Sequence, residues 1–464
     1  MAENEIHPVF QEIEERYRQK TPKSAEHNAR ARQSLPGGDT RTATYYQPYP
    51  ANMVRGKGCR LYDADGNEYI DMLNNYTSLI HGHAHPRVIE AARNQLENGS
   101  VFGSASEIQY THAEHLCGRV PSLDQVRYCN SGTEATLFAM RAARAFSGKE
   151  MFIKMDGGYH GSHDYIEVNV FPGSGTEPAD EGLPARHVEP GAPKSVLHDM
   201  LVVPFNDLDA AESLLKKYKG KIAAVMLEPM MGALGMVPPR PGFLNGLREL
   251  TDRFGVLLIF DEVITFRIST GGIQQADGVT PDLTALGKII GGGFPVGAFG
   301  GRKDIMAVFD PNQPNPVMHS GTFNGTDVIM AAGLATLEMY DQAAADRINA
   351  LGEKLRKGIA EAFKNAGMAG HASGRGSLAQ IHWRLDEVAR AMDTVEGFFL
   401  AGDIPRYLHL ELMNRGFYSA PRGMLVISTP MDEHVIDTFL GEFAEALHVV
   451  KPYVEEEAQH LLVS

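Results

Sequence analysis

Short apolar runs and segments with a helical period of apolar residues follow one another from about residue 86 onward. In chain order, helices are expected at 86–98, 134–147, 208–219 and 241–254, and strands at 126–129, 151–154, 200–203, 222–227 and 256–260. Strands that read as continuous apolar runs are typical of a parallel sheet with helices on both faces. The pattern therefore predicts an α/β fold around a central sheet.

Both ends of the chain show a different pattern. Near the N-terminus, an amphipathic helix is expected at 8–20 and short strands within 53–73. Toward the C-terminus, the expected helices lie after residue 326 up to about 340 and at 346–366, 403–415 and 431–450, and the expected strands lie at 379–383 and 424–428. The pattern predicts an N-terminal segment, 1–75, that joins a small α+β domain, a large domain, 76–335, and a C-terminal small domain, 336–464. The Gly-, Pro- and Glu-rich connection 170–194 is long enough to be a functional loop.

The composition narrows the class of protein. Over 464 residues, 43 Lys and Arg stand against 58 Asp and Glu, and this net charge of −15 disfavours nucleic acid and anionic membranes as partners. No apolar run is long enough to span a bilayer, and residues 1–11 lack the pattern of a signal peptide. Cys59, Cys117 and Cys129 are a sparse set typical of reduced thiols. We expect a soluble protein of the cytoplasm.

Asp261 is the first candidate for chemistry. It directly follows the apolar run 256–260, so an interior strand would place its carboxylate where open α/β sheets bind ligands. A buried carboxylate needs a cationic partner, because otherwise its pKa rises and it becomes neutral. Taken alone, the pair Asp261 and Glu262 would more often be the N-cap of the next helix.

Lys288 makes a ligand-binding role for Asp261 more plausible than an N-cap. It stands in the apolar, glycine-rich segment 283–293, with no acid close to it in the sequence. Desolvation lowers the pKa of a lysine, and a neutral amine is what imine formation requires. Glycines at 291–293 let the backbone approach a flat or bulky ligand. We therefore favour a reactive amine over an exposed surface lysine.

An anion site is expected where the strand 126–129 leads into the helix 134–147. Free N–H groups at a helix start, with the hydroxyls of Ser131 and Thr133, can hold a phosphate. The signal is weak by itself, because an ordinary capping box has the same pattern. Nearby in the sequence, Tyr159 offers an aromatic ring for stacking on a planar ligand, and packing within its own turn is an equal alternative.

Together these features point to one compound. Pyridoxal 5′-phosphate needs an anion site, a carboxylate for its ring nitrogen, a ring contact and a lysine for the imine. The blocks that resemble those of class III (subgroup II) pyridoxal-phosphate-dependent aminotransferases are NSGTEA (130–135), GYHG (158–161), FDEVI (260–264), LGKIIGGG (286–293) and SGTFN (320–324). The resemblance extends over about residues 35–449. It implies the type I fold of these enzymes: a large domain with a mainly parallel seven-stranded sheet, a small α+β domain, and a homodimer with shared active sites.

The same resemblance assigns roles to residues. Lys288 would form the covalent link to pyridoxal phosphate and move the proton, and Asp261 would pair with the ring nitrogen. Tyr159 would stack on the ring, Val263 would pack on its other face, and Glu228 would lie near its polar edge. The remaining cofactor contacts would come from Ser131, Gly132, Thr133 and His160, and from Thr322 of the neighbouring subunit.

The substrate stays open between two groups of relatives, the β-amino acid (β-phenylalanine-type) aminotransferases and the glutamate-1-semialdehyde 2,1-aminomutases. Arg41 and Arg422 match positions where the former use arginine for carboxylates, whereas aminomutases tend to carry another residue at the second. Two guanidinium groups would suit a ping-pong enzyme that binds first a β-amino acid, aromatic for example, and then a 2-oxo acid such as 2-oxoglutarate or pyruvate. The reacting carbon of these two acids differs by one bond in its distance from the carboxylate.

Other interpretations of these residues are kept. A surface ion pair is the alternative for either arginine, and an aminomutase-like isomerase or a transaminase for other amines is the alternative for the function. Tyr45, Tyr46 and Tyr76 would form an aromatic wall for a bulky side chain, although core tyrosines are the commoner case.

A histidine cluster, HGHAHP at 81–86, must also be weighed. On a strand, its alternate spacing would gather three imidazoles as a metal site might. Its Gly and Pro favour a loop before the helix 86–98, and we expect no metal ion.

Overall fold

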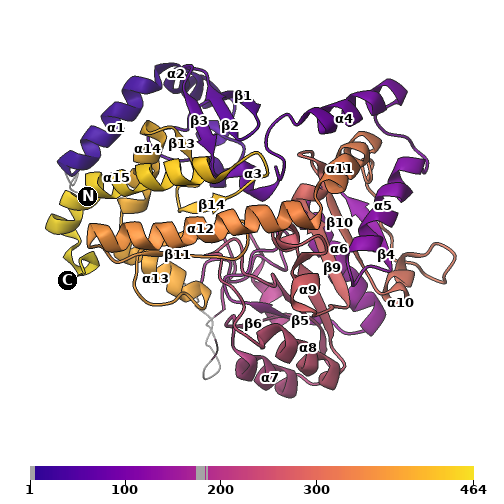
Figure 1. Ribbon diagram of the computed structural model, residues 1–464. Coiled ribbons are helices and arrows are strands. Elements are labelled where there is room, and N and C mark those ends of the chain that lie inside the picture. Colours follow the sequence, from indigo (N-terminus) through magenta and orange to yellow (C-terminus); the bar gives the residue numbers. More distant parts are fainter. Residues whose placement is uncertain (1–5, 174–182, 184–185, 464) are drawn as a thin grey trace.

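A seven-stranded sheet forms the centre of the larger part of the molecule (Figure 1). The computed structural model describes residues 6–173, 183 and 186–463. The sheet has the order β4-β10-β9-β8-β7-β5-β6. Its strands are β4 (Gln125–Cys129), β5 (Met151–Met155), β6 (Met200–Val203), β7 (Ile222–Leu227), β8 (Leu257–Asp261), β9 (Leu283–Gly287) and β10 (Gly297–Gly301). Only β10 runs antiparallel to its neighbours, β4 and β9. The expected α/β fold with a mainly parallel sheet is confirmed.

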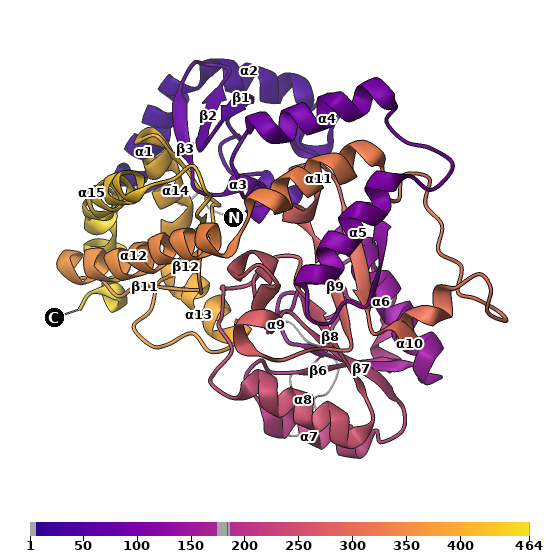
Figure 2. The ribbon, with the colours of Figure 1, turned by 45° about the vertical axis from the view of Figure 1, so that its right-hand side comes forward.

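Helices cover both faces of this sheet because its strands are apolar on both sides. The helices involved are α6 (Gly132–Ser147), α7 (Leu208–Lys217) and α8 (Phe243–Phe254). Leu258 and Phe260 of β8 pack in one cluster with α7 and α8, whereas Leu257 and Ile259 pack on the opposite face with α6. Figure 2 shows α7 and α8 together below the sheet. The continuous apolar run of β8 thus follows from burial on both faces.

The sequence analysis missed the strands β9 and β10. Glycine-rich segments such as Gly297–Gly301 read as loops because glycine weakens a strand. In the fold, Gly297 lies so close to the carbonyl of Ser131 that a Cβ atom would collide with it. Glycine is therefore required here by the close approach of β10 to the chain that follows β4.

The two ends of the chain fold together. One sheet has the order β1-β2-β3-β13 and another the order β11-β12-β14. Their strands are β1 (Met53–Lys57), β2 (Arg60–Asp63), β3 (Glu68–Asp71), β11 (His371–Ser373), β12 (Leu378–His382), β13 (Phe417–Tyr418) and β14 (Met424–Val426). Because β13 pairs in parallel with β3, C-terminal residues complete a sheet that N-terminal residues begin. The division at residues 75 and 335 stays a prediction.

The remaining helices lie around these sheets. They are α1 (Pro8–Lys20), α2 (Pro22–Ala31), α3 (Asn74–Thr77), α4 (Pro86–Asn98), α5 (Glu107–Arg119), α9 (Gly272–Asp277), α10 (Lys303–Met306), α11 (Asp327–Met339), α12 (Gln342–Ala366), α13 (Ala391–Ala401), α14 (Ile404–Asn414) and α15 (Glu433–Glu457). The helices α1 and α4 have the predicted bounds. The helix α5 was missed, since only His112 and Leu116 are buried in it and its apolar period is weak.

Two further sequence predictions concern the connection 170–194 and membrane-spanning helices. Of the expected functional loop 170–194, residues 174–182 and 184–185 lie outside the described residues. Among the helices that the structure describes, none combines the length and the apolar character needed to cross a bilayer.

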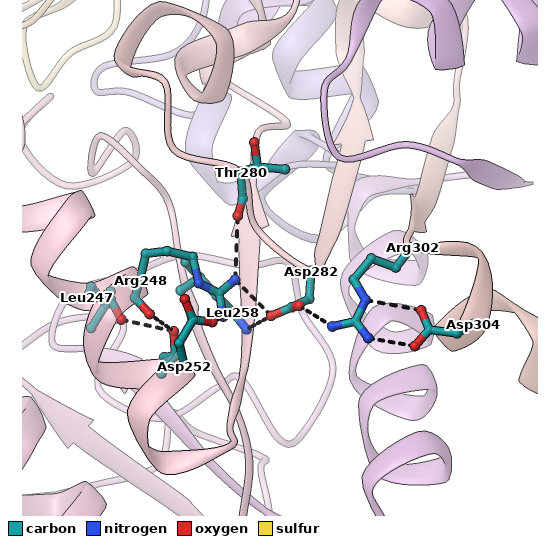
Figure 3. A network of polar contacts seen from close by, with 9 residues as sticks. Leu247, Arg248, Asp252, Leu258, Thr280, Asp282, Arg302 and Asp304 are labelled. Carbon is teal, nitrogen blue, oxygen red and sulfur yellow. Dashed lines mark hydrogen bonds and ion pairs between the residues drawn. The ribbon is translucent and has the colours of Figure 1, made fainter.

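The buried carboxylate of Asp282 links three elements through the polar network of Figure 3. This network lies near the start of β8, at the amino-terminal edge of the parallel strands. Asp282, which precedes β9, accepts from Arg248 of α8 at 2.9 Å and from Arg302 after β10 at 2.7 Å. It also accepts from the backbone N–H of Leu258 at 2.8 Å. Asp282 therefore compensates two guanidinium charges and satisfies one buried N–H group.

Asp282→Ala is expected to lower the free energy of unfolding by about 1–3 kcal/mol, because it leaves the buried N–H of Leu258 without an acceptor, while Arg248 keeps its pair with Asp252 and Arg302 its pair with Asp304. Urea denaturation measures this change. Arg253→Ala is the control: its pair with Glu212 is more exposed, and its loss is expected to cost below about 1 kcal/mol. Equal losses in the two variants would contradict the role assigned to Asp282.

Candidate active site

A cavity of about 530 Å³ lies at the carboxyl edge of the central sheet. The predicted residues that line it are Arg41, Tyr76, Ser131, Gly132, Thr133, Tyr159, His160, Glu228, Asp261, Val263 and Lys288. They come from segments far apart in the sequence. They meet because β4, β5, β7, β8 and β9 all end at this edge.

Asp261 ends β8 and is almost fully buried, with 4% of its surface exposed. Its Oδ2 lies 2.9 Å from Nδ1 of His160, which is itself buried, and its Oδ1 accepts from the N–H of Val263 at 3.1 Å. A carboxylate held by these two contacts has a fixed orientation at the wall of the cavity. It can pair with a cationic nitrogen of a ligand.

Lys288 follows β9 and faces the same cavity. Burial lowers its pKa, while the charges of Asp261 and Glu228 raise it, and burial prevails. The absence of an acid near Lys288 in the sequence was therefore misleading, since the fold supplies two. Within the described chain, its ammonium group makes no hydrogen bond to the protein, so the amine is available to a ligand.

The first turn of α6 forms the predicted anion site. Ser131 Oγ accepts from the N–H of Glu134 at 3.2 Å, and the Glu134 carboxylate accepts from the N–H of Asn130 at 2.7 Å. The predicted N-cap at Ser131 is therefore real, although the Glu134 carboxylate accepts from Asn130, one residue earlier than in a reciprocal capping box. This N-cap leaves the N–H groups of Gly132 and Thr133 without intrahelical acceptors, as in every first helical turn. The capping and the anion-binding interpretations are compatible.

Two apolar surfaces border the space between these groups. Val263 packs so closely on Gly132 and Gly287 that a Cβ atom on either glycine would lie 3.3 Å from it. Tyr159, with 39% of its surface exposed, lines the cavity, and its N–H donates to Glu228 Oε2 at 3.2 Å. Burial, and then the nearby charge of Asp261, raise the pKa of Glu228 to about 8.

The outer wall is formed by an unusual turn. All residues of α3 (Asn74–Thr77) have positive φ angles, between 46° and 77°, a left-handed conformation that each residue with a Cβ atom adopts at a cost. The buried guanidinium of Arg267 donates to the carbonyl of Thr77 at 3.2 Å and helps hold the turn. Asn75 accepts from Arg41 Nη1 at 2.9 Å and so orients this arginine.

Arg422 lies behind this wall. It is absent from the cavity lining, and its guanidinium lies 5.9 Å from the centre of the Tyr76 ring. Burial lowers its pKa, and in the described part of the chain neither Arg422 nor Arg41 forms an ion pair. Among residues 6–173, 183 and 186–463, the structure therefore shows no surface ion pair at either arginine.

Two predictions for aromatic residues are corrected. Tyr46 belongs to the core, where its hydroxyl lies 3.3 Å from that of Tyr17, and Tyr45 accepts from Arg32 at 3.1 Å. Neither lines the cavity. Of the three tyrosines, Tyr76 forms part of the wall.

Thr322 is exposed and does not line the cavity within this chain. Its role as a contact from a neighbouring subunit stays a prediction.

The sequence analysis missed part of the lining. The additional residues are Asn75, Ser78, Asn130, Gly161, Ile264, Gly293, Phe294, Pro295 and Val296. Asn130, Gly161, Ile264 and Gly293 stand inside recognised blocks, and the others adjoin such a block or Tyr76. Proximity to these blocks was the available signal.

The histidines at 81–86 do not gather. His83 Nε2 lies 2.7 Å from Asp71, whereas His81 contacts Thr429 Oγ1 at 2.8 Å and the carbonyl of Thr336 at 3.0 Å. Within residues 6–173, 183 and 186–463, no three His, Cys, Asp or Glu side chains are placed to share a metal ion. His81 and His83 have these protein partners instead, and His85 lies with its ring centre 5.5 Å from that of His81.

Known proteins are similar to this chain in sequence and in fold over most of its length. It is 40% identical over 426 residues to a glutamate-1-semialdehyde 2,1-aminomutase of Ignicoccus hospitalis, covering 90% of this chain and 97% of that protein. It is 37% identical over 408 residues to a β-phenylalanine transaminase of Variovorax paradoxus, covering 88% of each. The crystal structure of an omega-transaminase from Sphaerobacter thermophilus, 44% identical, superposes with a TM-score of 0.88 over 92% of this chain and 98% of that one. The family model of class-III aminotransferases matches residues 42–430, and this chain therefore belongs to that family of pyridoxal-phosphate-dependent enzymes.

Proposed function

We propose that this enzyme transfers an amino group from a β-amino acid, aromatic ones included, to a 2-oxo acid such as 2-oxoglutarate or pyruvate by a ping-pong mechanism. The observation that carries the proposal is that two guanidinium groups lie near Tyr76: that of Arg41, which lines the cavity, and that of Arg422, 5.9 Å from the centre of the Tyr76 ring. The similarity to a β-phenylalanine transaminase supports it.

The cavity suits pyridoxal phosphate. Its wall combines a buried carboxylate, Asp261, a helix start with free N–H groups at Gly132 and Thr133, and an amine without a protein partner, Lys288. The bound cofactor supplies an aldehyde for amines and a protonated ring that withdraws electrons from the reacting carbon. These groups match, in kind, what the cofactor's ring nitrogen, phosphate and aldehyde each require.

Each residue then has one task. Asp261 would hold the proton on the ring nitrogen, with His160 fixing the orientation of its carboxylate. The cofactor's phosphate would be bound by Ser131, Gly132 and Thr133, its ring would lie between Tyr159 and Val263, and its polar edge would face Glu228. Lys288 Nζ would take the proton from the reacting carbon and return it. These residues would contact the cofactor and would serve any amino donor. Other residues must therefore determine which substrate is bound.

The two arginines would set the substrate class. Arg41 lies at the cavity itself, whereas Arg422 lies behind Tyr76, so their guanidinium groups stand at different depths. In the proposed reaction, a carboxylate at one distance from the reacting carbon would pair with Arg41, and a carboxylate at the other distance would pair with Arg422 once Tyr76 moves aside. Tyr76 would provide the apolar surface for an aryl side chain.

Arg41→Ala is expected to raise KM for a β-amino acid about 10- to 100-fold, the value of a lost hydrogen bond to a charged group. The rate with a simple amine that lacks a carboxylate is expected to change by less than about twofold. Steady-state kinetics with both donors measure the two effects. Equal effects on both donors would exclude Arg41 as a carboxylate anchor.

A donor panel tests the proposed reaction itself. The enzyme is incubated with each amino donor of the panel, which covers β-aryl β-amino acids, α-amino acids, diamines and simple amines. The pyridoxamine form of the enzyme is then incubated with separate 2-oxo acids. Transfer of nitrogen from a β-amino acid to a different skeleton supports the proposal. Return of nitrogen to the same skeleton would instead indicate an isomerase like the glutamate-1-semialdehyde aminomutases, to which this chain is also similar.

We also propose a homodimer in which Thr322 reaches the phosphate site of the partner subunit. Thr322 is exposed next to Phe323, a large apolar side chain with 58% of its surface exposed. The resemblance to class III aminotransferases, which implies active sites shared between two subunits, supports this proposal.

A further inference from the structure

A buried histidine outside the cavity lies against the turn that carries Lys288. His112 of α5 is fully buried, and its Nδ1 lies 2.7 Å from the hydroxyl of Tyr128. Its Nε2 lies 2.9 Å from the carbonyl oxygen of Ile290. Ile290 belongs to the 3₁₀ turn Lys288–Gly291, and His112 itself does not line the cavity.

The partners of this imidazole decide where its proton lies. A carbonyl oxygen can only accept, so Nε2 carries the proton and donates to Ile290. Nδ1 therefore accepts from the hydroxyl of Tyr128. Burial lowers the pKa of His112 to about 4, so the ring is neutral at neutral pH. The result is a chain of hydrogen bonds with one direction, from Tyr128 through His112 to Ile290.

The turn needs such support. Lys288 has a φ of 51°, a left-handed conformation that is unfavourable for a residue with a Cβ atom. The helix α11 packs directly over the hydrogen bond, because a Cβ atom on Gly333 would collide with the Ile290 carbonyl and lie 2.8 Å from His112 Nε2. The carbonyl is thereby closed off from water, and His112 is the donor that the fold provides for it.

The other end of the chain of hydrogen bonds reaches the anion site. Tyr128 lies on β4, three residues before Ser131, and pairs with Ala298 of β10. Ala298 in turn pairs with Leu286 of β9, two residues before Lys288. The segment that leads to the anion site and the segment that leads to the lysine are thus joined twice, by the sheet and by His112.

We propose that His112 is a positioning residue, which holds the Lys288 turn so that the amine faces the cofactor cavity, while Tyr128 fixes the orientation of the imidazole. This inference rests on the proposed role of Lys288 as the residue that reacts with the cofactor. His112 acts through Ile290 and touches neither cofactor nor substrate. If the turn is released, the amine becomes less buried and its pKa rises, because burial is what lowers it.

Covalent attachment of pyridoxal phosphate to the apoprotein tests the inference. Attachment is trapped with borohydride across a series of pH values and quantified at Lys288 by peptide mass spectrometry. His112→Leu removes the donor, and we expect attachment at neutral pH to slow about tenfold and its pH midpoint to rise by about one unit. His112→Gln keeps an N–H donor, and we expect it to stay within about twofold of the wild type. Asp261 and Glu228, the acids that act on Lys288, are unchanged in both variants.

His81→Leu is the matched control. Like His112, His81 is a buried imidazole between a hydroxyl, that of Thr429, and a carbonyl, that of Thr336, and burial lowers its pKa to about 4. It makes no hydrogen bond to the Lys288 turn. We expect His81→Leu to lose stability comparably and to keep the wild-type rate and pH midpoint of attachment within about twofold.

Each outcome has one meaning. An unchanged His112→Leu variant, or equal effects in His112→Leu and His81→Leu, would overturn the inference. If His112→Leu does not fold, Tyr128→Phe is used, since it leaves the imidazole in place; we then expect attachment to slow about threefold, and an unchanged rate would overturn the inference. Wild-type protein that fails to attach the cofactor at Lys288 would contradict the proposed function instead.

Discussion

Lys288→Ala is expected to abolish covalent attachment of pyridoxal phosphate and to lower the transamination rate by about 10²–10⁴-fold, the range for a lost proton-transfer group. Lys288 supplies the amine without a protein partner in the cavity, and its lowered pKa favours the neutral form that can react. Protein mass after borohydride reduction measures attachment, and initial rates with a β-amino acid measure activity.

Lys154→Met is the control for that prediction, because Lys154 is a second buried lysine whose pKa is lowered, to about 8. Its Nζ donates to the carbonyls of Ile166 at 3.0 Å and Val168 at 2.6 Å, so it is occupied by the protein. We expect this variant to lose stability and to keep attachment. Attachment that survives in Lys288→Ala but not in Lys154→Met would show that the wrong lysine was assigned.

Asp261→Asn is expected to lower kcat by about 10²–10³-fold, the effect of removing one preorganised electrostatic partner from a reacting group. A neutral amide cannot stabilise a proton on the ring nitrogen as a carboxylate does, and His160 also loses its anionic partner. Steady-state kinetics give kcat, and equilibrium dialysis gives the affinity for pyridoxal phosphate, which we expect to fall in parallel.

Glu262→Gln is the matched control, one residue further along the chain. Glu262 is fully buried but points away from the cavity, where it accepts from the N–H groups of Ile273 at 2.9 Å and Gln274 at 3.0 Å at the start of α9. We expect lower stability and a kcat within about threefold of the wild type, since this carboxylate supports the fold only. Similar kcat values for Asp261→Asn and the wild type would exclude the pairing of Asp261 with the cofactor.

The roles of the adjacent acids Asp261 and Glu262 could not be told apart from the local sequence pattern. In the sequence, Asp261 and Glu262 could both have been caps of the following helix, and the structure divides the roles between them. Glu262 does cap α9, whereas Asp261 faces the cavity. Successive residues at the end of a strand point to opposite faces, so only one of two adjacent carboxylates can reach the ligand side.

The sequence by itself determined that the sheet is mainly parallel, five of its seven strands and the chain positions of Asp261, Lys288 and the helix start at Gly132. Burial on both faces makes such strands continuously apolar, and charged or glycine-rich residues must follow where the strands end. These are properties of neighbouring residues, which a sequence displays directly.

Only the tertiary structure decided which distant residues surround that edge. It placed Tyr46 in the core and Tyr76 at the cavity, arranged Asn75 to orient Arg41, and set His112 against the Lys288 turn. Such contacts join segments that are far apart in the chain, and the left-handed turn at α3 is held by a partner as distant as Arg267. Local periodicity carries no information about these pairings, because packing between whole elements selects them.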